Sequence, residues 1–166
     1  MSKVSTISPC LWFDSQAEEA AKFYTSIFPN SRINAIARYT EAGQENHGRP
    51  PGSVMTVAFE LDGQSFTALN GGPLFTFNEA ISLQVDCPTQ KEIDYYWDKL
   101  GEGGDPKSRQ CGWIKDKFGL AWQVVPMQLR EMMLASDTAK SGRAMKAVMR
   151  MKKLDIAEIT KAFNGQ

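Results

Sequence analysis

Hydrophobic and polar positions follow two different periods along the first half of this chain. The apolar residues over 17–28 recur as on one face of an amphipathic helix, and Asp14 and Ser15 before them are N-cap candidates. Two β-rich segments meet at Asp62-Gly63, a dipeptide typical of hairpin turns. The predicted elements are a strand over 7–13, the helix, a strand over 32–40, a polar loop over 41–52, and hairpin strands over 54–61 and 64–70. The order is therefore βαβββ.

The same pattern returns in the second half. Residues 80–86 alternate like a strand, Pro88 and Thr89 open a helix that runs to Leu100, and 111–126 predicts two strands around a turn. Hydrophobic positions in the two halves match at one offset of 72 residues, for example Phe13 with Val85. The sequence therefore predicts a duplicated module, with a shorter second copy that lacks a counterpart to the polar loop.

The last forty residues have a different composition. They are rich in Met, Lys and Ala and predict helices over about 127–135, 138–153 and 155–163. Basic residues share one face of the middle helix, which fits a solvated face of an amphipathic extension better than a nucleic-acid-binding helix. The predicted organisation is a paired domain over 1–126, with modules 1–72 and 78–126, followed by a helical extension over 127–166.

Composition narrows the classes of function. The chain has 166 residues, with 19 Lys plus Arg and 19 Asp plus Glu, so no net field draws nucleic acid or an anionic membrane. No apolar run reaches the roughly 20 residues that a membrane-spanning helix needs. The N-terminal residues lack the long apolar core of a secretory signal. Cys10, Cys87 and Cys111 are odd in number and lack CxxC spacing, which favours reduced thiols and a cytoplasmic location.

Several reactive residue types have a simpler structural interpretation. His47, the one histidine, lies in the polar loop and is expected to be exposed there. Cys111 has no histidine to form a nucleophilic pair with, so a small buried hydrophobic side chain is favoured. Asp116 and Lys115 lie at a predicted β-turn, where charges are usually solvated.

Strand alternation instead indicates a ligand-binding surface. If the apolar members of each strand face the helices, polar and aromatic residues share the opposite face. The ligand-binding candidates are Ser8, Trp12, Asn70, Ser82, Trp113 and Gln123. Such a lining suits a neutral or weakly polar small molecule. The alternative, that these groups satisfy one another's hydrogen bonds within a packed sheet, is equally open.

Long motifs in this chain resemble a known family. The motifs are PCLWFDSQAEEAAKFYTSIFPNS, FTALNGGP, FTFNEAIS, YYWDKL, CGWIKDKFGLAWQVVP and MKKLDIAEI. They resemble PhnB-like proteins, a bacterial family labelled "3-demethylubiquinone-9 3-methyltransferase domain", within the glyoxalase/bleomycin-resistance/dioxygenase (vicinal oxygen chelate) superfamily. The resemblance implies an α+β fold in which two βαβββ modules form a cupped eight-stranded sheet around a cavity, here with the C-terminal helical tail added.

The resemblance also permits a test for the metal site of that superfamily. Its metal-using members take His and Glu ligands from the first and last strands of each module. The matching positions here are Ser8, Ala80, Asn70 (or Ala68) and Gln123, which are poor ligands for a divalent transition metal. We therefore expect no metal and no cofactor. The first strand is followed by Asp14-Ser15-Gln16 rather than a glycine-rich turn, so an adenosylmethionine site of the doubly wound type is not indicated.

Three functions follow as hypotheses. The first is a metal-free protein that binds an unknown small molecule and forms a homodimer, the assembly that the resemblance implies. The second is an enzyme of the superfamily (a lyase, a dioxygenase or a methyltransferase) with a non-standard site. The third is an interaction module that acts through the helical tail.

Overall fold

The computed structural model describes residues 7–166, and it divides into two compact units. The first unit ends at Phe77 and the second spans Asn78–Gln166. The first six residues, with which the predicted domain 1–126 and module 1–72 begin, lie outside the described part. Each unit contains one sheet and helices, so the α+β class and the C-terminal helices are confirmed.

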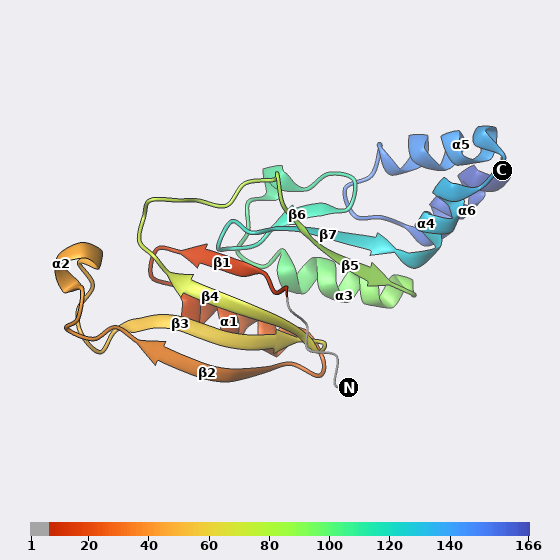
Figure 1. Cartoon of the computed structure of the whole chain (residues 1–166). Helices are drawn as coiled ribbons and strands as arrows, with labels where there is room; N and C mark the ends of the chain where they lie inside the picture. Colours follow the sequence, from red (N-terminus) through yellow and green to blue (C-terminus); the bar gives the residue numbers. More distant parts are fainter. Residues whose placement is uncertain (1–6) are drawn as a thin grey trace. The chain divides into compact units, whose positions relative to one another are not determined.

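The first unit is a four-stranded sheet with one long helix (Figure 1). Its elements are β1 (Cys10–Phe13), α1 (Ala17–Ile27), β2 (Arg32–Arg38), the one-turn α2 (Gln44–His47), β3 (Val54–Leu61) and β4 (Gln64–Asn70). The strand order is β1-β4-β3-β2. β1 runs parallel to β4, and the other neighbours are antiparallel. The predicted βαβββ order is confirmed, with α2 as an added turn inside the predicted loop.

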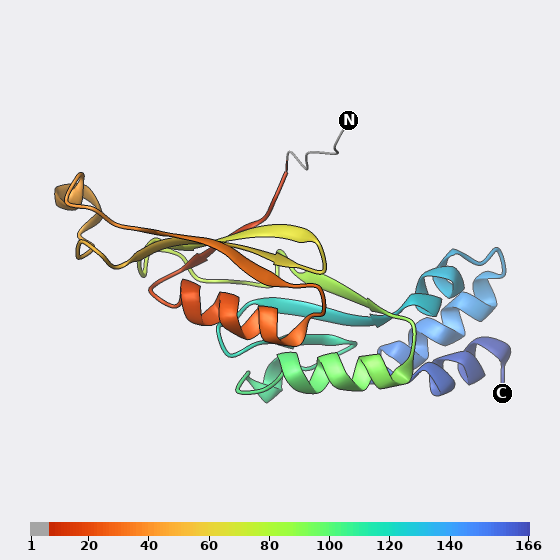
Figure 2. The same ribbon diagram turned by 90° about the horizontal axis from the view of Figure 1, so that it is seen from below.

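Alternating side chains bury one face of this sheet under α1 (Figure 2). Val57 and Phe59 on β3 and Ala68 on β4 are fully buried, as is Tyr24 on the helix. The rings of Tyr24 and Phe59 stack with centroids 6.3 Å apart. The apolar side chains that recur every two residues in the strands and every three to four residues in the helix therefore pack together in one core.

The second unit repeats this arrangement with one strand fewer. Its elements are β5 (Leu83–Cys87), α3 (Gln90–Leu100), the 3₁₀ turn η1 (Pro106–Ser108), β6 (Trp113–Lys115) and β7 (Ala121–Pro126). The order β5-β7-β6 matches β1-β4-β3, again with the first and last strands parallel. The resemblance implied eight strands, but the described residues form seven. The segment after α3 is glycine-rich, contains Pro106 and makes only one isolated bridge, between Gln110 and Trp113, before β6 begins.

The two long helices begin in different ways. Thr89 caps α3 with a capping box, in which its side chain accepts from the backbone N–H of Glu92 and the Glu92 side chain accepts from the N–H of Thr89. The prediction that Thr89 opens this helix is thus confirmed. The N-cap of α1 is Gln16, without a side-chain cap bond, rather than Asp14 or Ser15. The reason lies in β4, which supplies the missing acceptor from Asn70.

The C-terminal helices are built onto the second unit. They are α4 (Met127–Leu134), α5 (Thr138–Val148) and α6 (Ile156–Asn164), around a small core of Ala144, Val148, Leu154 and Ile159. The helix predicted over 138–153 ends at Val148. It stops because the next residues leave the helix to pair with the chain before β6: Met151 and Lys152 carbonyls accept from the N–H groups of Cys111 and Gly112, both at 2.8 Å. Within residues 7–166, none of the helices has the length and apolar character to cross a membrane.

Candidate functional site

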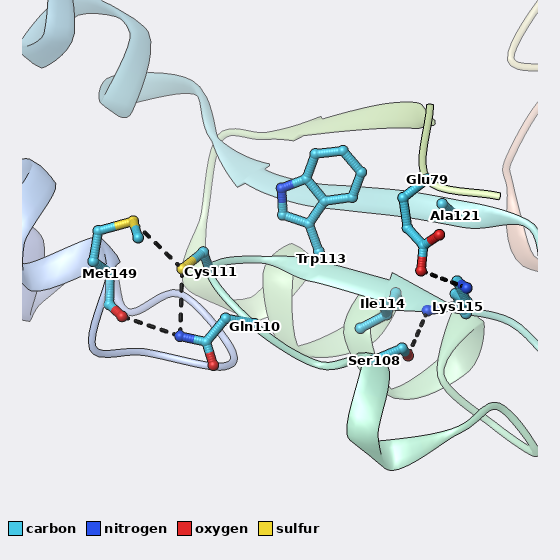
Figure 3. Close-up of a pocket in the computed structure, with 9 residues that line it drawn as sticks. All are labelled: Glu79, Ser108, Gln110, Cys111, Trp113, Ile114, Lys115, Ala121 and Met149. Carbon is cyan, nitrogen blue, oxygen red and sulfur yellow. Dashed lines mark hydrogen bonds and ion pairs between the residues drawn. The ribbon is translucent and has the colours of Figure 1, made fainter. Parts of the chain in front are cut away.

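A pocket of about 390 Å³ lies on the second unit, beside β6 (Figure 3). It is lined by Glu79, Ser108, Gln110, Cys111, Trp113, Ile114, Lys115, Ala121 and Met149. These residues come from the segment before β5, the η1 turn, the residues between η1 and β6, the strands β6 and β7, and the residue that follows α5. The indole of Trp113 stands in the middle of this lining, between a sulfur-containing end and a charged end.

Strand register determines which side chains reach the pocket. Trp113 pairs with Gln123 and Lys115 pairs with Ala121 in the antiparallel β6–β7 ladder, so these four residues share one face of the sheet. Trp122, by contrast, is buried on the opposite face. In the sequence, Trp113 is a candidate aromatic side chain beside the polar face, and in the structure Trp113 lines the pocket.

Asp116 holds the turn that joins β6 and β7. Its Oδ1 accepts hydrogen bonds from the N–H groups of Phe118 (2.8 Å) and Leu120 (3.1 Å), and its Oδ2 accepts from Trp122 Nε1 (2.9 Å). The carboxyl group is only 2% exposed, so the expectation of a solvated charge is wrong. Its role is nevertheless structural, because backbone and indole N–H groups occupy its oxygens.

One end of the pocket carries an ion pair. Lys115 Nζ lies 2.5 Å from Glu79 Oε1, and the hydrogen bond from Lys115 lowers the pKa of Glu79. Beside them, Ser108 Oγ accepts from the Lys115 N–H and donates to the Asp105 carbonyl. This end can therefore hold a polar group of a ligand, while the pair keeps the local net charge near zero.

The opposite end contains two sulfur atoms. Cys111 Sγ lies 3.7 Å from Met149 Sδ, and Gln110 Nε2 donates to Cys111 Sγ and to the Met149 carbonyl. Cys111 has a backbone φ of +52°, which the pairing of its N–H with Met151 holds in place. The tail thus contributes a side chain to the pocket and fixes the strand entry next to it.

Ser82 and Gln123 lie on the face that carries Trp113 but satisfy each other. Gln123 Nε2 donates to Ser82 Oγ at 2.9 Å, and neither residue is among those that line the pocket. Gln123 is directly opposite both Gln84 and Trp113 in the sheet. The structure therefore brings three of the six candidates together, with two of them already bonded to each other.

Asn70 lies on the helix face of the first sheet, not on the face that corresponds to Gln123. Its register partner is Phe13, whereas the repeat pairs Gln123 with Gln84, the equivalent of Trp12. The Asn70 amide makes two bonds to the backbone: Oδ1 accepts from Ala17 N–H at 2.8 Å, and Nδ2 donates to Val54 O at 3.1 Å. Asn70 therefore acts as the N-terminal cap that α1 lacks locally.

Ser8 and Trp12 complete the candidates in the first unit. Ser8 is exposed and precedes β1. Trp12 donates from Nε1 to Gly72 O at 2.8 Å and makes an edge contact with Phe75. A Cβ on Gly71 would lie 2.2 Å from the indole, so glycine is required for this packing. These two residues are not part of the pocket on the second unit.

Several members of the pocket lining had no sequence signal, among them Glu79 and Met149. Glu79 lies outside every predicted strand, and Met149 was assigned to a continuous helix. A salt bridge and a strand-like backbone pairing bring them to the site, and neither can be deduced from local periodicity. His47 stacks on Tyr39 with ring centroids 4.5 Å apart, and its Nδ1 accepts from Arg49 N–H.

The side chains at the four expected metal positions do not fit a divalent ion. Ser8 and Ala80 are exposed, and the amides of Asn70 and Gln123 are engaged as described. Across residues 7–166, no three or more His, Cys, Asp and Glu side chains are grouped so as to hold a metal. The three cysteines are unpaired thiols, and burial raises the pKa of Cys87 to about 12, helped by Glu92 and Asp86.

Comparisons with known proteins agree on one family. The model of the 3-demethylubiquinone-9 3-methyltransferase family matches residues 5–125. A PhnB protein from Bacillus cereus, whose description carries the same methyltransferase name, is 38% identical over 74% of this chain and 99% of its own, with a TM-score of 0.62. A search of curated proteins found no match.

A more distant structure shares the fold. A protein from Pseudomonas aeruginosa is 19% identical over 74% of this chain and 98% of its own, with a TM-score of 0.55. A glyoxylase/bleomycin resistance protein/dioxygenase domain from Frankia sp. is 15% identical over 76% of this chain and 92% of its own, with a TM-score of 0.43. The family match ends at residue 125, so the C-terminal helices, including the MKKLDIAEI motif, lie beyond it.

Proposed function

Because this chain belongs to the 3-demethylubiquinone-9 3-methyltransferase family, as a PhnB-like member of the glyoxalase/bleomycin-resistance superfamily, we propose that it binds a small organic molecule without a divalent metal. The proposed binding site is the pocket beside β6 on the second unit. The observation that carries the proposal is the position of Trp113, whose ring stands between an apolar sulfur end and a polar end.

The composition of the pocket supports an amphipathic ligand. Trp113, Ala121 and Met149 offer apolar surface, on which a flat or aliphatic part of the ligand can be desolvated. Ser108 and the Glu79–Lys115 pair lie at one end and can orient a polar substituent. A volume of about 390 Å³ is within the range of sites for small molecules, roughly 300 to 1,000 Å³.

A metal-free mode follows from the side chains at the expected ligand positions. Amide oxygens are neutral and bind a divalent transition metal poorly. The amide groups of Asn70 and Gln123 are also engaged within the protein, because Asn70 Nδ2 donates to Val54 O and Gln123 Nε2 donates to Ser82 Oγ. The family name points to methyl transfer, but no arrangement in the described residues favours catalysis over binding. We therefore propose binding alone, in a cytoplasmic homodimer that keeps its cysteines reduced.

The test is a small-molecule screen on the full chain by thermal shift, followed by calorimetric titration of each compound that binds. We expect Trp113→Ser to weaken a confirmed ligand by about tenfold or more, because the indole supplies the central contact surface. Met149→Gln should weaken it as well. Met145→Gln is the matched control, because Met145 is exposed on the same helix but does not line the pocket.

Metal titration is run in parallel with Zn²⁺, Ni²⁺ and Mn²⁺. We expect no stoichiometric binding and no change in the melting temperature. A stoichiometric divalent ion that is lost in Gln123→Ala would contradict the metal-free site. Ligands whose affinity is unchanged in Trp113→Ser and Met149→Gln would contradict the position of the binding site.

A further inference from the structure

A second candidate site lies in the helical tail, outside the residues of the family match. Between Lys140 and Lys153, six residues are Lys or Arg and none is Asp or Glu. The chain as a whole has no net charge, so this segment is a local concentration of positive charge. A cluster of basic residues indicates a binding site only if the fold brings their side chains together in one groove.

The structure does so between α5 and α6. A groove of about 330 Å³ is lined by Arg143, Lys146, Ala147, Arg150, Ala162, Gly165 and Gln166, and we call it the α5–α6 groove. Arg143 and Lys146 lie three residues apart on α5, and Arg150 follows two residues after the helix ends. All three cations line the same groove. Alanine and glycine form much of the remaining lining, so a ligand can approach the backbone closely.

The three cations are not equivalent. Arg143 is held by α6, donating from Nε to Ala162 O (3.0 Å) and from Nη2 to Phe163 O (2.8 Å). These are carbonyls of the last turn of α6, whose partial negative charge Arg143 offsets. The guanidinium of Arg143 is therefore held in place by α6, and it contributes positive charge to the groove without being free to move toward a ligand.

Lys146 and Arg150 have the opposite character. Both are exposed, and within residues 7–166 neither forms an ion pair or a side-chain hydrogen bond. Two other cations of the tail do have partners, since Lys153 pairs with Asp94 at 2.6 Å and Lys161 with Glu158 at 3.3 Å. The groove therefore carries two positive charges without an acidic partner among the described residues, on Lys146 and Arg150, beside the fixed positive charge of Arg143.

We propose that the α5–α6 groove binds a phosphate-bearing anion, with Lys146 and Arg150 donating to phosphate oxygens and Arg143 stabilising the charge from behind. Arginine matches the oxygens of a phosphate with its planar fork, and lysine acts as a point charge with three donors. Three cations balance a multiply charged phosphate better than a single carboxylate. The proposal is independent of the pocket beside β6.

The observations favour a compact phosphate over a nucleic acid. Lys146 and Arg150 share one groove with Arg143, and the sequence pI of about 6.6 gives no general attraction to a polyanion. A nucleic-acid surface would need a longer basic stripe with several equivalent contacts. The two kinds of site can be distinguished by mutation. A compact site loses affinity only when its own two cations are replaced, whereas a diffuse positive surface loses affinity when any two of its cations are replaced.

The experiment is calorimetric titration of the full chain with inorganic pyrophosphate, against sodium chloride at matched ionic strength. We expect saturable one-to-one binding, and a loss of about tenfold or more in affinity for the double variant Lys146→Gln/Arg150→Gln. The control is Arg130→Gln/Lys152→Gln, which removes two exposed tail charges outside the groove and should leave affinity within about twofold. Lys146→Arg should retain binding.

A second measurement keeps the result independent of variant folding. In ¹⁵N-resolved spectra of the unaltered chain, pyrophosphate should shift the amide signals of Ala147 and Gly165 more than those of the β6 region. Non-saturable binding, or equal losses in the two double variants, would overturn the proposal. A twelve-nucleotide single strand that binds while pyrophosphate does not would also overturn it, in favour of a nucleic-acid surface.

Discussion

Asn70 shows at the residue scale why a polar side chain on a strand need not be a ligand group. It joins three elements, because its amide caps α1 and bonds to the start of β3 while its carbonyl accepts from the Tyr39 hydroxyl at 2.7 Å. The side chain is buried, with 6% exposure. Removing the amide leaves the Ala17 N–H and the Val54 carbonyl without this partner.

We therefore predict that Asn70→Ala lowers the free energy of unfolding by about 1–3 kcal/mol, the range for loss of a buried hydrogen-bonded group. Ser8→Ala, on an exposed residue, should change it by less than about 0.5 kcal/mol. Both are measured by urea denaturation followed by circular dichroism. If Asn70→Ala is as stable as the parent chain, the capping role of Asn70 is wrong.

Gly71 provides a steric prediction with a control inside the same chain. The indole of Trp12 occupies the space where a side chain at Gly71 would begin, whereas a Cβ on Gly142 in α5 would meet nothing within 4 Å. Gly71→Ala should destabilise the first unit by about 1–3 kcal/mol, as overpacking does. Gly142→Ala should stabilise the chain by about 0.5–1 kcal/mol, because alanine is the better helix former. Thermal unfolding of both variants distinguishes the two signs.

At the scale of elements, local periodicity predicted both modules closely but missed their non-local features. The helices α1 and α3 and the β3–β4 hairpin are encoded by their own apolar spacing and by turn residues such as Asp62-Gly63. The end of α5 could not be predicted, since Met151 and Lys152 leave the helix to pair with Cys111 and Gly112. The same limit applies to the site, because Glu79 and Met149 reach the pocket through tertiary contacts that local periodicity does not encode.

One of the contacts that attach the tail to the rest of the second unit is made by a glutamine. Gln90 on α3 accepts from Ile156 N–H at 2.9 Å and donates to Leu154 O at 3.1 Å, so it bridges the residues that lead into α6. Gln90→Ala should therefore destabilise this junction by about 1–2 kcal/mol. Gln44→Ala, on an exposed residue of α2, is the control and should have no measurable effect.

Hydrogen exchange gives the sharper measurement of this contact. In Gln90→Ala, the amides of α6 should exchange faster, while those of β3 and β4 in the first unit should keep their protection. Uniform faster exchange across both units would contradict a local contact. This test also addresses the tail as an interaction module, because a tail bound to Cys111 and Gly112 through its backbone, and to Asp94 through Lys153, is not a detachable arm.

At the scale of the whole molecule, the surface retains apolar side chains that one copy of the chain does not cover. Leu74, in the segment after β4, is 74% exposed, and its neighbour Phe75 is 58% exposed. Burial of such side chains stabilises association by roughly 25 cal/mol per Å² of apolar surface. A symmetric dimer uses the same patch twice, so one exposed segment on each chain can serve both halves of an interface.

We predict that the chain is a dimer at micromolar concentration in sedimentation equilibrium and that Leu74→Glu weakens the dimer by about tenfold or more. A carboxylate placed in a self-complementary apolar contact faces its own copy, so both desolvation and like-charge repulsion oppose assembly. Leu134→Glu is the matched control, because Leu134 on α4 is 77% exposed and receives the same change in charge. At 100 µM, about a hundred times a micromolar dissociation constant, a dimer would predominate. A parent chain that is monomeric at this concentration would contradict the dimer. Equal weakening by both variants would instead show that net charge, and not this segment, governs association.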